Sequence, residues 1–376
     1  MPRVYIDEWP QPIEAGRLRI LEAALDAGVP FPHGCGSGEC GTCKCRLIEG
    51  EVKHDRHSPD ALSEEEYESG LILACRSRPL TDVTVKWLSD SSPALMIKHD
   101  AVVGRIEQAS RDVVLLTVQL RPDQAFPFRA GQFAKLRFGR LPARSYSMAS
   151  QPGEHELVFH IRVRPDGRVS QHVAHELRAG DPVEVRGPFG EAYWQGAREP
   201  RAAPRPAAST PGAPGAGDAV ARAGPRVQDG AEAGHLLLLA GGTGMAPILS
   251  VLDAALRDGQ DPRRIDVYHG VRTPSDLYAE RELRRRVVDF GVRFVPVFAE
   301  GGPGRTGLLH DAVGEDFHDL GASLIHVAGP PPMVEAVRSV ARSRGASPER
   351  IRADAFHASE PEKRSLWERI TAWGSL

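Results

Sequence analysis

The feature that most constrains this chain is a group of cysteines in the segment HGCGSGECGTCKC, residues 33–45. Cys35, Cys40 and Cys43 have the spacing C-x4-C-x2-C, and Cys75 follows later in the chain. This spacing is typical of the ligands of one class of [2Fe–2S] cluster, whereas structural zinc, the alternative, usually has two close ligand pairs. No histidine has the ligand spacing of a Rieske centre. We therefore expect these four cysteines to bind a [2Fe–2S] cluster.

Glycines separate the expected ligands, at positions 34, 36, 38 and 41. A loop wrapped around a cluster must bring backbone N–H groups close to sulfide, and glycine allows this because it has no side chain. The fifth cysteine, Cys45, lies in the strand-like run CKCRLIEGEV. We interpret Cys45 as a small buried apolar residue.

Residues 1–92 have the pattern of a small α+β domain around this loop. VYIDEW and DVTVKW are predicted strands, and LRILEAALDAG is a predicted helix that ends at Gly28. Ser63 and Glu66 form a predicted capping box at the start of a second helix. With the cysteine spacing, these elements resemble a plant-type ferredoxin domain, and the resemblance implies a β-grasp fold.

Residues 98–196 change to short alternating runs that predict an antiparallel β-barrel. Within them, RSYSMAS resembles the FAD-binding motif of the ferredoxin reductase family. The resemblance implies that Arg144 pairs with the FAD pyrophosphate, that Tyr146 lies against the flavin ring and that Ser147 bonds near flavin N5. An ordinary barrel strand is the alternative.

A second flavin element is predicted in FHIRVRPDGRVSQHVAHEL, a strand, a turn and a helix. The family resemblance implies contacts to the adenosine half and the pyrophosphate of FAD from His160, Ile161, Arg162, Val163, Gly167, Arg168, Val169 and Ser170. A helix N-terminus offers free N–H groups to such an anion. Ser170 is also expected to be the N-cap of this helix. GPFG, residues 187–190, resembles the loop that follows in the family.

Residues 197–234 are rich in Ala, Pro and Gly and contain few large apolar side chains. Such a composition buries too little apolar surface to offset the entropy of ordering. We expect a disordered surface insertion at this point, with partner docking through its arginines as the alternative.

Residues 235–358 alternate predicted strands and helices, which indicates a doubly wound parallel sheet. HLLLLAGGTGMAPILSVLDAAL differs from the G-x-G-x-x-G fingerprint and resembles the NAD(P) motif of the ferredoxin reductase family. AGPPPM resembles the family's element beside the nicotinamide. The resemblance implies nucleotide contacts from Gly241, Gly242, Thr243, Gly244, Met245, Pro247, Gly329, Pro330 and Met333. Ala328 stands where many relatives have cysteine, so no catalytic thiol is expected there.

The last predicted strand, IRADAFHAS, contains Phe356, which matches an aromatic residue that covers the flavin in similar reductases. A phenylalanine of the core is the alternative. Arg272 is expected near the nucleotide ribose, where it would favour a 2′-phosphate, whereas Asp276 would oppose one. We expect NADH as substrate, with NADPH also possible. The tail, residues 359–376, has helical apolar spacing and is expected to pack on the domain or to contact a partner.

The order of iron–sulfur, flavin and nicotinamide domains resembles the reductase components of bacterial aromatic-ring oxygenases. The resemblance implies that NAD(P)H reduces FAD beside Ser147 and Phe356, its two expected catalytic residues. Electrons then pass singly to the cluster and on to a ferredoxin or a terminal oxygenase, in aromatic hydrocarbon catabolism. The reductase of a di-iron monooxygenase or deoxysugar dehydratase, and a redox-sensing interaction protein, are the alternatives.

Composition limits the partners and the compartment. The formal charge of −3 gives no basis for binding nucleic acid or an anionic membrane. No apolar run approaches the roughly 20 residues of a membrane span, and the first residues contain no apolar run of signal-peptide length. We expect a cytoplasmic monomer, because clustered cysteines in a reducing compartment indicate a metal site rather than disulfides.

Overall fold

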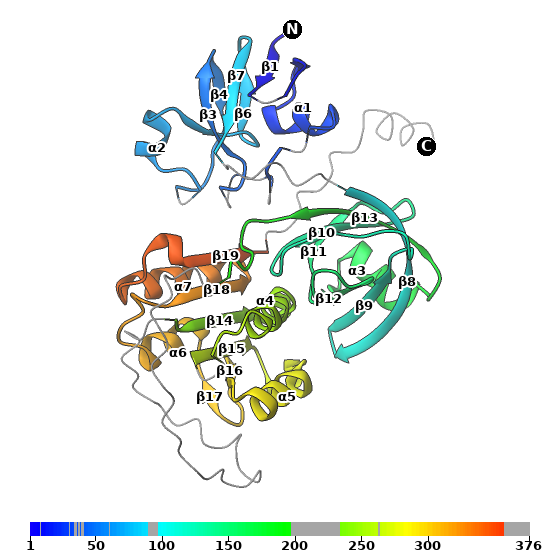
Figure 1. Ribbon diagram of the computed structural model, residues 1–376, viewed down its shortest axis with the longest axis vertical. Helices are drawn as coiled ribbons and strands as arrows, with labels where there is room; N and C mark the ends of the chain where they lie inside the picture. The colour runs from blue at the N-terminus through cyan, green and yellow to red at the C-terminus, as the bar shows by residue number, and fades with distance from the viewer. Residues whose placement is uncertain are drawn as a thin grey trace. The chain divides into compact units, whose positions relative to one another are not determined.

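The computed structural model describes residues 1–7, 9–29, 31–33, 36, 38, 41–59, 61–88, 97–196, 234–261 and 264–356 (Figure 1). The chain divides into two compact units, Met1–Met96 with Arg137–Arg144, and Ile97–Leu136 with Ser145–Phe356. No helix within the described ranges is long and apolar enough to cross a membrane. Of the expected insertion at 197–234, residues 197–233 lie outside these ranges, as do the tail at 359–376, Cys35 and Cys40.

The N-terminal domain is a mixed sheet with the order β2-β1-β7-β3-β5, beside the small pair β4-β6. Its elements are β1 (Arg3–Ile6), β2 (Ile13–Glu14), α1 (Ile20–Asp26), β3 (Lys44–Glu49), β4 (Val52–His54), α2 (Glu64–Glu68), β5 (Leu71–Leu73), β6 (Ser77–Pro79) and β7 (Val83–Trp87). The first and last strands, β1 and β7, pair in parallel at its centre. This arrangement confirms the predicted β-grasp fold.

Local signals in this domain act as predicted. Gly28 follows α1 with a φ of 78°, a left-handed conformation that glycine adopts without strain. The Ser63 hydroxyl accepts from the Glu66 amide at 3.2 Å, and the Glu66 carboxylate accepts from the Ser63 amide at 2.9 Å. The capping box is therefore confirmed.

The following domain is an antiparallel sheet with the order β11-β10-β13-β8-β9-β12. Its elements are β8 (Ile97–Ser110), β9 (Val113–Gln119), β10 (Phe133–Phe138), β11 (Arg144–Ser147), β12 (Glu156–Arg162), α3 (Arg168–His175) and β13 (Pro182–Phe189). A bridge between Met148 and Phe159 joins its two edges, which closes the sheet nearly into the predicted barrel. β8 begins four residues earlier than the alternating run at Ala101 predicts.

The C-terminal domain is a parallel sheet with the order β17-β16-β15-β14-β18-β19. Its elements are β14 (Leu236–Gly241), the 3-10 helix Gly242–Gly244, α4 (Met245–Arg257), β15 (Ile265–Val271), the 3-10 helix Pro274–Asp276, α5 (Glu280–Phe290), β16 (Arg293–Phe298), β17 (Arg305–Thr306), α6 (Leu309–Asp316), β18 (Leu324–Gly329), α7 (Pro331–Ser343), the 3-10 helix Pro348–Arg350 and β19 (Ile351–Ala355).

Helices cover both faces of this sheet (Figure 1). Leu236 and Leu238 of β14 pack in one apolar cluster with α4, while Leu237 and Leu239 pack in another with α6 and α7. Successive side chains of a strand point to opposite faces, so a strand buried on both sides is continuously apolar. The doubly wound sheet is confirmed.

Candidate functional site

Two of the expected cluster ligands are described, and the fold brings them together. Cys43 precedes β3 and Cys75 follows β5, and these two strands pair antiparallel. Both cysteines are buried, and the Cys75 amide donates to the Cys43 sulfur at 3.4 Å. An N–H···S contact of this kind stabilises a thiolate ligand and tunes an iron–sulfur site.

Three described glycines beside these cysteines have left-handed backbone conformations. Gly36, Gly38 and Gly41 have φ values of 71°, 83° and 73°, which favour glycine. A Cβ atom at Gly38 would lie 2.7 Å from Cγ of Arg76, so this turn has no room for a side chain. The sulfur donors and the glycine backbone fit a [2Fe–2S] cluster.

Cys45 does not belong to this ligand set. It lies opposite Trp87 in the β3–β7 pairing and is fully buried in the apolar core of the domain. Burial raises the pKa of its thiol far above the usual range, which keeps it protonated and a poor metal ligand. The interpretation of Cys45 as a core residue agrees with this placement.

The flavin motif lies on the edge strand β11. Arg144 is partly exposed and donates to the Ala143 carbonyl at 2.9 Å, and Tyr146 is also partly exposed. Ser147 is buried, and its hydroxyl donates to the Asp354 carboxylate of β19 at 3.0 Å. Burial raises the pKa of Asp354 to about 6.

Asp354 was missed by the sequence analysis. The sequence feature that could have revealed it is a carboxylate two residues before Phe356, in a final strand that is otherwise largely apolar. The Phe356 amide donates to the Gly329 carbonyl at 2.9 Å, and its ring packs against the apolar cluster that contains Trp194 and Ala328. The structure therefore brings together the flavin strand, the AGPPPM element and the last strand.

The predicted adenosine strand, β12, sends its side chains in different directions. His160 and Ile161 are buried, whereas Arg162 is exposed and pairs with Asp112 at 3.0 Å. Val163 donates its amide to the Asp112 carbonyl at 2.7 Å. These side chains do not converge on one surface, so contacts from the whole set to one ligand would have to include the strand backbone as well as side chains.

The expectation that Ser170 is an N-cap is wrong. α3 begins at Arg168, with Gly167 as its N-cap, and Ser170 lies within the first turn. Its hydroxyl accepts from the Arg164 amide at 3.1 Å and donates to the Gly167 carbonyl at 3.0 Å. The tight turn before Gly167 starts the helix earlier, so this hydroxyl ties the turn to the helix. Val169 is buried in the same turn of α3.

The glycine turn after β14 packs against the start of α7. A Cβ atom at Gly244 would lie 2.0 Å from the Ala328 oxygen, and one at Gly241 would lie 2.3 Å from the Met333 sulfur. Pro330 is the N-cap of α7. The two predicted nucleotide motifs are therefore adjacent, because β14 and β18 are neighbouring strands.

One glycine of the turn faces open space. Gly242 has a φ of 53°, and, apart from its own turn and chain neighbours, no atom of the described residues lies within 4 Å of where its Cβ would be. Thr243 beside it is partly exposed, while Met245 and Pro247 are buried in the first turn of α4. A bare backbone before a helix N-terminus fits a pyrophosphate, because free N–H groups point toward the anion.

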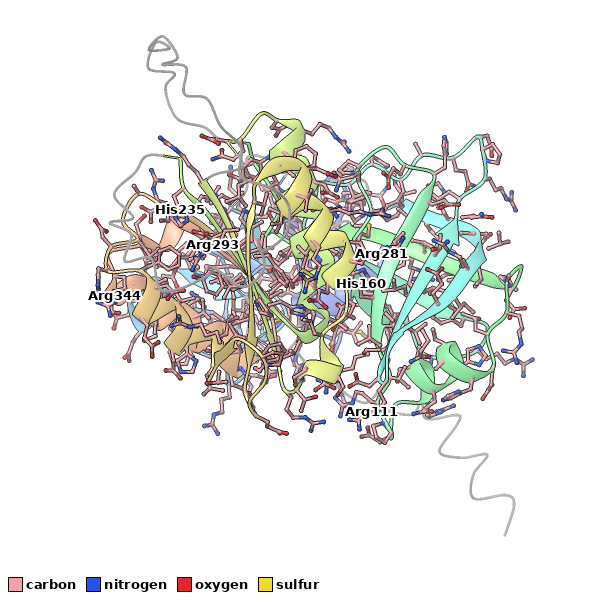
Figure 2. The ribbon with its side chains drawn as sticks, turned by 90° about the horizontal axis from the view of Figure 1, so that it is seen from below. Arg111, His160, His235, Arg281, Arg293 and Arg344 are labelled. Carbon is pink, nitrogen blue, oxygen red and sulfur yellow. The ribbon has the colours of Figure 1, made fainter. Side chains whose placement is uncertain are left out.

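His269 and Tyr278 contact the Gly242 carbonyl, and His160 contacts the Tyr278 hydroxyl. His269 Nε2 lies 3.0 Å from this oxygen, and the Tyr278 hydroxyl donates to it at 3.4 Å. His160, labelled in Figure 2, lies with Nδ1 3.0 Å from the same hydroxyl and so links the barrel to the turn. Burial lowers the pKa of His160 to about 3 and that of His269 to about 4, so both are neutral. The sequence analysis missed Tyr278 and His269, which carry no motif signal.

Arg272 follows β15 and is exposed. Its Nε lies 3.9 Å from the Asp276 carboxylate and 3.6 Å from the Glu300 carboxylate. Glu300 was not anticipated from the sequence, because it follows a different strand.

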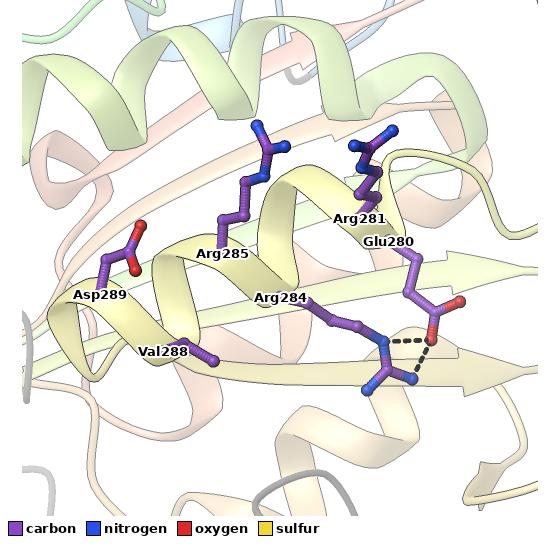
Figure 3. A pocket seen from close by; sticks show the side chains of 6 residues that line it. All are labelled: Glu280, Arg281, Arg284, Arg285, Val288 and Asp289. Atoms are coloured by element: carbon purple, nitrogen blue, oxygen red, sulfur yellow. Dashed lines mark hydrogen bonds and ion pairs between the residues drawn. The ribbon is translucent and has the colours of Figure 1, made fainter. Parts of the chain in front are cut away.

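A shallow depression lies on the outer side of α5 (Figure 3). Its lining residues are Glu280, Arg281, Arg284, Arg285, Val288 and Asp289. All of them belong to one helix, and none belongs to the flavin strand or the nucleotide turn.

Comparison with known proteins agrees with this division of the chain. The 2Fe-2S iron-sulfur cluster binding domain matches residues 6–80, the oxidoreductase FAD-binding domain matches 100–194, and the oxidoreductase NAD-binding domain matches 238–339. Each match lies within one of the three domains described above. The predicted cofactors, a [2Fe–2S] cluster, FAD and NAD(P)H, are confirmed.

Similar proteins extend over nearly the whole chain. The reductase component of the naphthalene 1,2-dioxygenase system of Pseudomonas putida is 32% identical, over 92% of this chain and 95% of the relative. The reductase subunit of an aromatic O-demethylase from Amycolatopsis is 33% identical, over 90% and 93%. The crystal structure of the Amycolatopsis cytochrome P450 reductase GcoB matches with a TM-score of 0.72 and 31% identity, over 96% of this chain and 100% of that one.

The three cofactor-binding domains occur in the order iron–sulfur, flavin and nicotinamide, and these relatives align over at least 90% of this chain. Together these findings identify the family. The chain belongs to the family of ferredoxin–NAD(P)⁺ reductase components, in which electrons pass from NAD(P)H through FAD and a [2Fe–2S] cluster to a ferredoxin or an oxygenase component.

Proposed function

We propose that this protein supplies electrons to an oxygenase that hydroxylates an aromatic ring, either directly or through a separate ferredoxin. The relatives named above serve a naphthalene dioxygenase system and an aromatic O-demethylase, which supports an aromatic substrate for the system as a whole. We also propose that the protein is a cytoplasmic monomer. Its proposed domains are residues 1–92, 98–196 and 235–358, with an insertion at 197–234 and a tail at 359–376.

The observation that carries the electron path is the hydrogen bond between Ser147 and Asp354. It joins the end of the flavin strand to the last strand of the nucleotide domain. Bound FAD exchanges two electrons with a nicotinamide and single electrons with an iron–sulfur cluster. We propose that Ser147 and Phe356 line the place where nicotinamide and flavin meet, and that Asp354 holds the Ser147 hydroxyl in a fixed orientation.

The remaining assignments follow from the positions of the motifs. We propose that the flavin is held by Arg144, Tyr146, His160, Ile161, Arg162, Val163, Gly167, Arg168, Val169 and Ser170. We propose that the nucleotide is held by Gly241, Gly242, Thr243, Gly244, Met245, Pro247, Arg272, Gly329, Pro330 and Met333, and the cluster by Cys35, Cys40, Cys43 and Cys75. The open space at Gly242 and the N–H···S contact at Cys43 support these two sets.

Electron delivery to defined acceptors tests the proposal. The reconstituted protein with NADH is offered a Rieske ferredoxin, a ring-hydroxylating dioxygenase, a di-iron hydroxylase and a deoxysugar dehydratase in turn. We expect the fastest reduction with the first or the second. A preference for the di-iron protein or the dehydratase would replace the proposed acceptor. Failure to reduce cytochrome c would favour a redox-sensing protein.

A further inference from the structure

Arg272 and Glu300 are held side by side at the carboxyl edge of the parallel sheet. They follow the neighbouring parallel strands β15 and β16. Backbone hydrogen bonds continue between the two chain segments just beyond the carboxyl ends of these strands. The Ala299 amide donates to the Val271 carbonyl at 3.0 Å, and the Glu300 amide donates to the Arg272 carbonyl at 2.9 Å. The backbone therefore sets the proximity of the two charged side chains.

The loop after Glu300 is packed against the loop after Arg272. A Cβ atom at Gly302 would lie 2.7 Å from the Phe298 ring and 2.8 Å from the Pro274 ring. Only glycine allows this approach, so Glu300 is anchored on both sides. The packing of the two loops therefore places the Arg272 and Glu300 side chains within ion-pair distance.

The Arg272 guanidinium has a second acidic neighbour, Asp276. This carboxylate accepts from the Thr273 amide at 2.9 Å and from the Thr273 hydroxyl at 2.8 Å, and it is 14% exposed. Burial acts to raise the pKa of Asp276, but the Thr273 bonds and the Arg272 charge bring it below its usual range. Asp276 is therefore ionised and has a structural role of its own.

Glu300 has no comparable structural role. Its carboxylate is 60% exposed, and within the described part of the chain its ion-pair partner is Arg272. Arg272, Asp276 and Glu300 together carry a net charge of −1, and Arg111, whose charge also lowers the pKa of Asp276, brings the wider group to neutrality. Glu300 is the member whose charge can be removed without breaking a turn.

This arrangement bears on the choice of nucleotide. Ligands of open α/β sheets bind at the carboxyl ends of the strands, where an acidic residue accepts from a ribose 2′-hydroxyl and an arginine takes a 2′-phosphate. A phosphate carries close to two negative charges at neutral pH, so it would be repelled by the Glu300 carboxylate, which also pairs with the Arg272 guanidinium. A 2′-hydroxyl can instead donate to a carboxylate.

We propose that Glu300 makes NADH the preferred nucleotide, by occupying the Arg272 guanidinium and repelling a 2′-phosphate. The inference rests on the proposed placement of the nucleotide at the carboxyl edge of β14 and β15. It assigns a specificity-determining role to a residue that follows β16, outside the glycine turn and the AGPPPM element.

Equilibrium binding to the holoenzyme tests the proposal with two probes that differ only at the 2′ position, AMP and adenosine 2′,5′-bisphosphate. In Glu300→Gln we expect the bisphosphate to bind at least about fivefold more tightly, because one nearby charge has been removed. The affinity for AMP should change by less than about twofold. Arg272→Ala combined with Glu300→Gln should lose the gain.

Glu315→Gln is the matched control. Glu315 is an exposed carboxylate that pairs with Arg305, at the end of α6. The adjacent Asp316 contacts Arg293, the first residue of β16, whereas Glu300 follows the last residue of that strand. The control removes the same charge and should leave both affinities unchanged.

The outcomes separate this inference from the proposed function. If Glu300→Gln leaves the ratio of the two affinities unchanged, the role of Glu300 is wrong. If the control gives the same gain, net charge and not Glu300 decides the selectivity, and the proposal is overturned. Reduction of cytochrome c by NADH in the same preparations reports on the electron path alone, so a failure there concerns the proposed function.

Discussion

The Ser147 hydroxyl donates a 3.0 Å hydrogen bond to the Asp354 carboxylate, across 207 positions of the chain. The bond joins β11 of the barrel to β19 of the parallel sheet. Because burial raises the pKa of Asp354 to about 6, this carboxyl changes its charge just below neutral pH. The strand that carries the flavin motif is thus in contact with a titrating group of the nucleotide domain.

This pKa makes the stability of the protein depend on pH. Asp354 is protonated in the folded and unfolded states below about pH 4, and it is ionised in both above about pH 6. Its burial therefore costs nothing at low pH and costs about 3 kcal/mol once the folded carboxyl has ionised. We expect Asp354→Asn to raise the melting temperature relative to the wild type at pH 7.5 and to lose this advantage near pH 4. If the difference in melting temperature between Asp354→Asn and the wild type were the same at both pH values, Asp354 would not have a raised pKa in the folded protein.

Removal of the Ser147 hydroxyl should slow flavin reduction. In Ser147→Ala the buried carboxylate loses its donor, and a bond to a charged group is worth about 1.5–3 kcal/mol. If the bond orients the site in the transition state, the rate should fall about tenfold or more, with FAD content unchanged. Stopped-flow reduction by NADH measures this rate. The control is Ser145→Ala, an exposed serine of the same strand, which should reduce at the wild-type rate.

Two of the buried cysteines, Cys75 and Cys45, should respond oppositely to substitution by alanine. Cys75→Ala removes an expected ligand, so we expect loss of the iron–sulfur absorption and of cytochrome c reduction. Reduction of ferricyanide, which takes electrons from the flavin, should persist. Cys45→Ala should retain all three properties, because Cys45 lies in the apolar core of the same domain. Loss of the iron–sulfur absorption in both variants would mean that packing, and not ligation, is being measured.

The Tyr278 hydroxyl links the barrel to the nucleotide turn, because it contacts His160 of β12 and the Gly242 carbonyl. We expect Tyr278→Phe to destabilise the protein by about 1–2 kcal/mol, since a buried hydrogen bond is lost and its partners remain. NADH binding should weaken in parallel. Because the pKa values of His160 and His269 are about 3 and about 4, the effect should be constant from pH 5 to 8. Calorimetric unfolding at several pH values tests this, and a strong pH dependence would show that a histidine is charged.

The glycines of the nucleotide turn should differ in their tolerance of alanine. Gly244→Ala places a methyl group 2.0 Å from the Ala328 oxygen, so we expect a misfolded or strongly destabilised domain. Gly242→Ala meets no neighbour and should fold at a cost of about 1 kcal/mol for its left-handed conformation. Its methyl group would stand in the open space above the turn, so NADH affinity should fall. Circular dichroism and NADH titration of both variants separate the two effects.

Much of the fold could be predicted because it rests on local patterns. Alternation in ELVFHIRV and continuous apolar character in LLLLA distinguish a strand at a surface from one buried on both sides. Two motifs far apart, at Gly241 and Gly329, meet because parallel neighbouring strands align their carboxyl ends. Ser170 shows the limit, since an N-cap depends on where the helix begins, and that was decided by the turn before Gly167.

The sequence by itself determined the order of the three domains, the class of each cofactor and the motifs at which they are bound. Only the tertiary structure decided that Asp354 meets Ser147, that His160 meets Tyr278 and that Glu300 meets Arg272. The physical reason is that periodicity records whether a side chain faces the core or the solvent. It does not record which distant side chain completes a hydrogen bond or an ion pair, because strand order and packing bring those partners together.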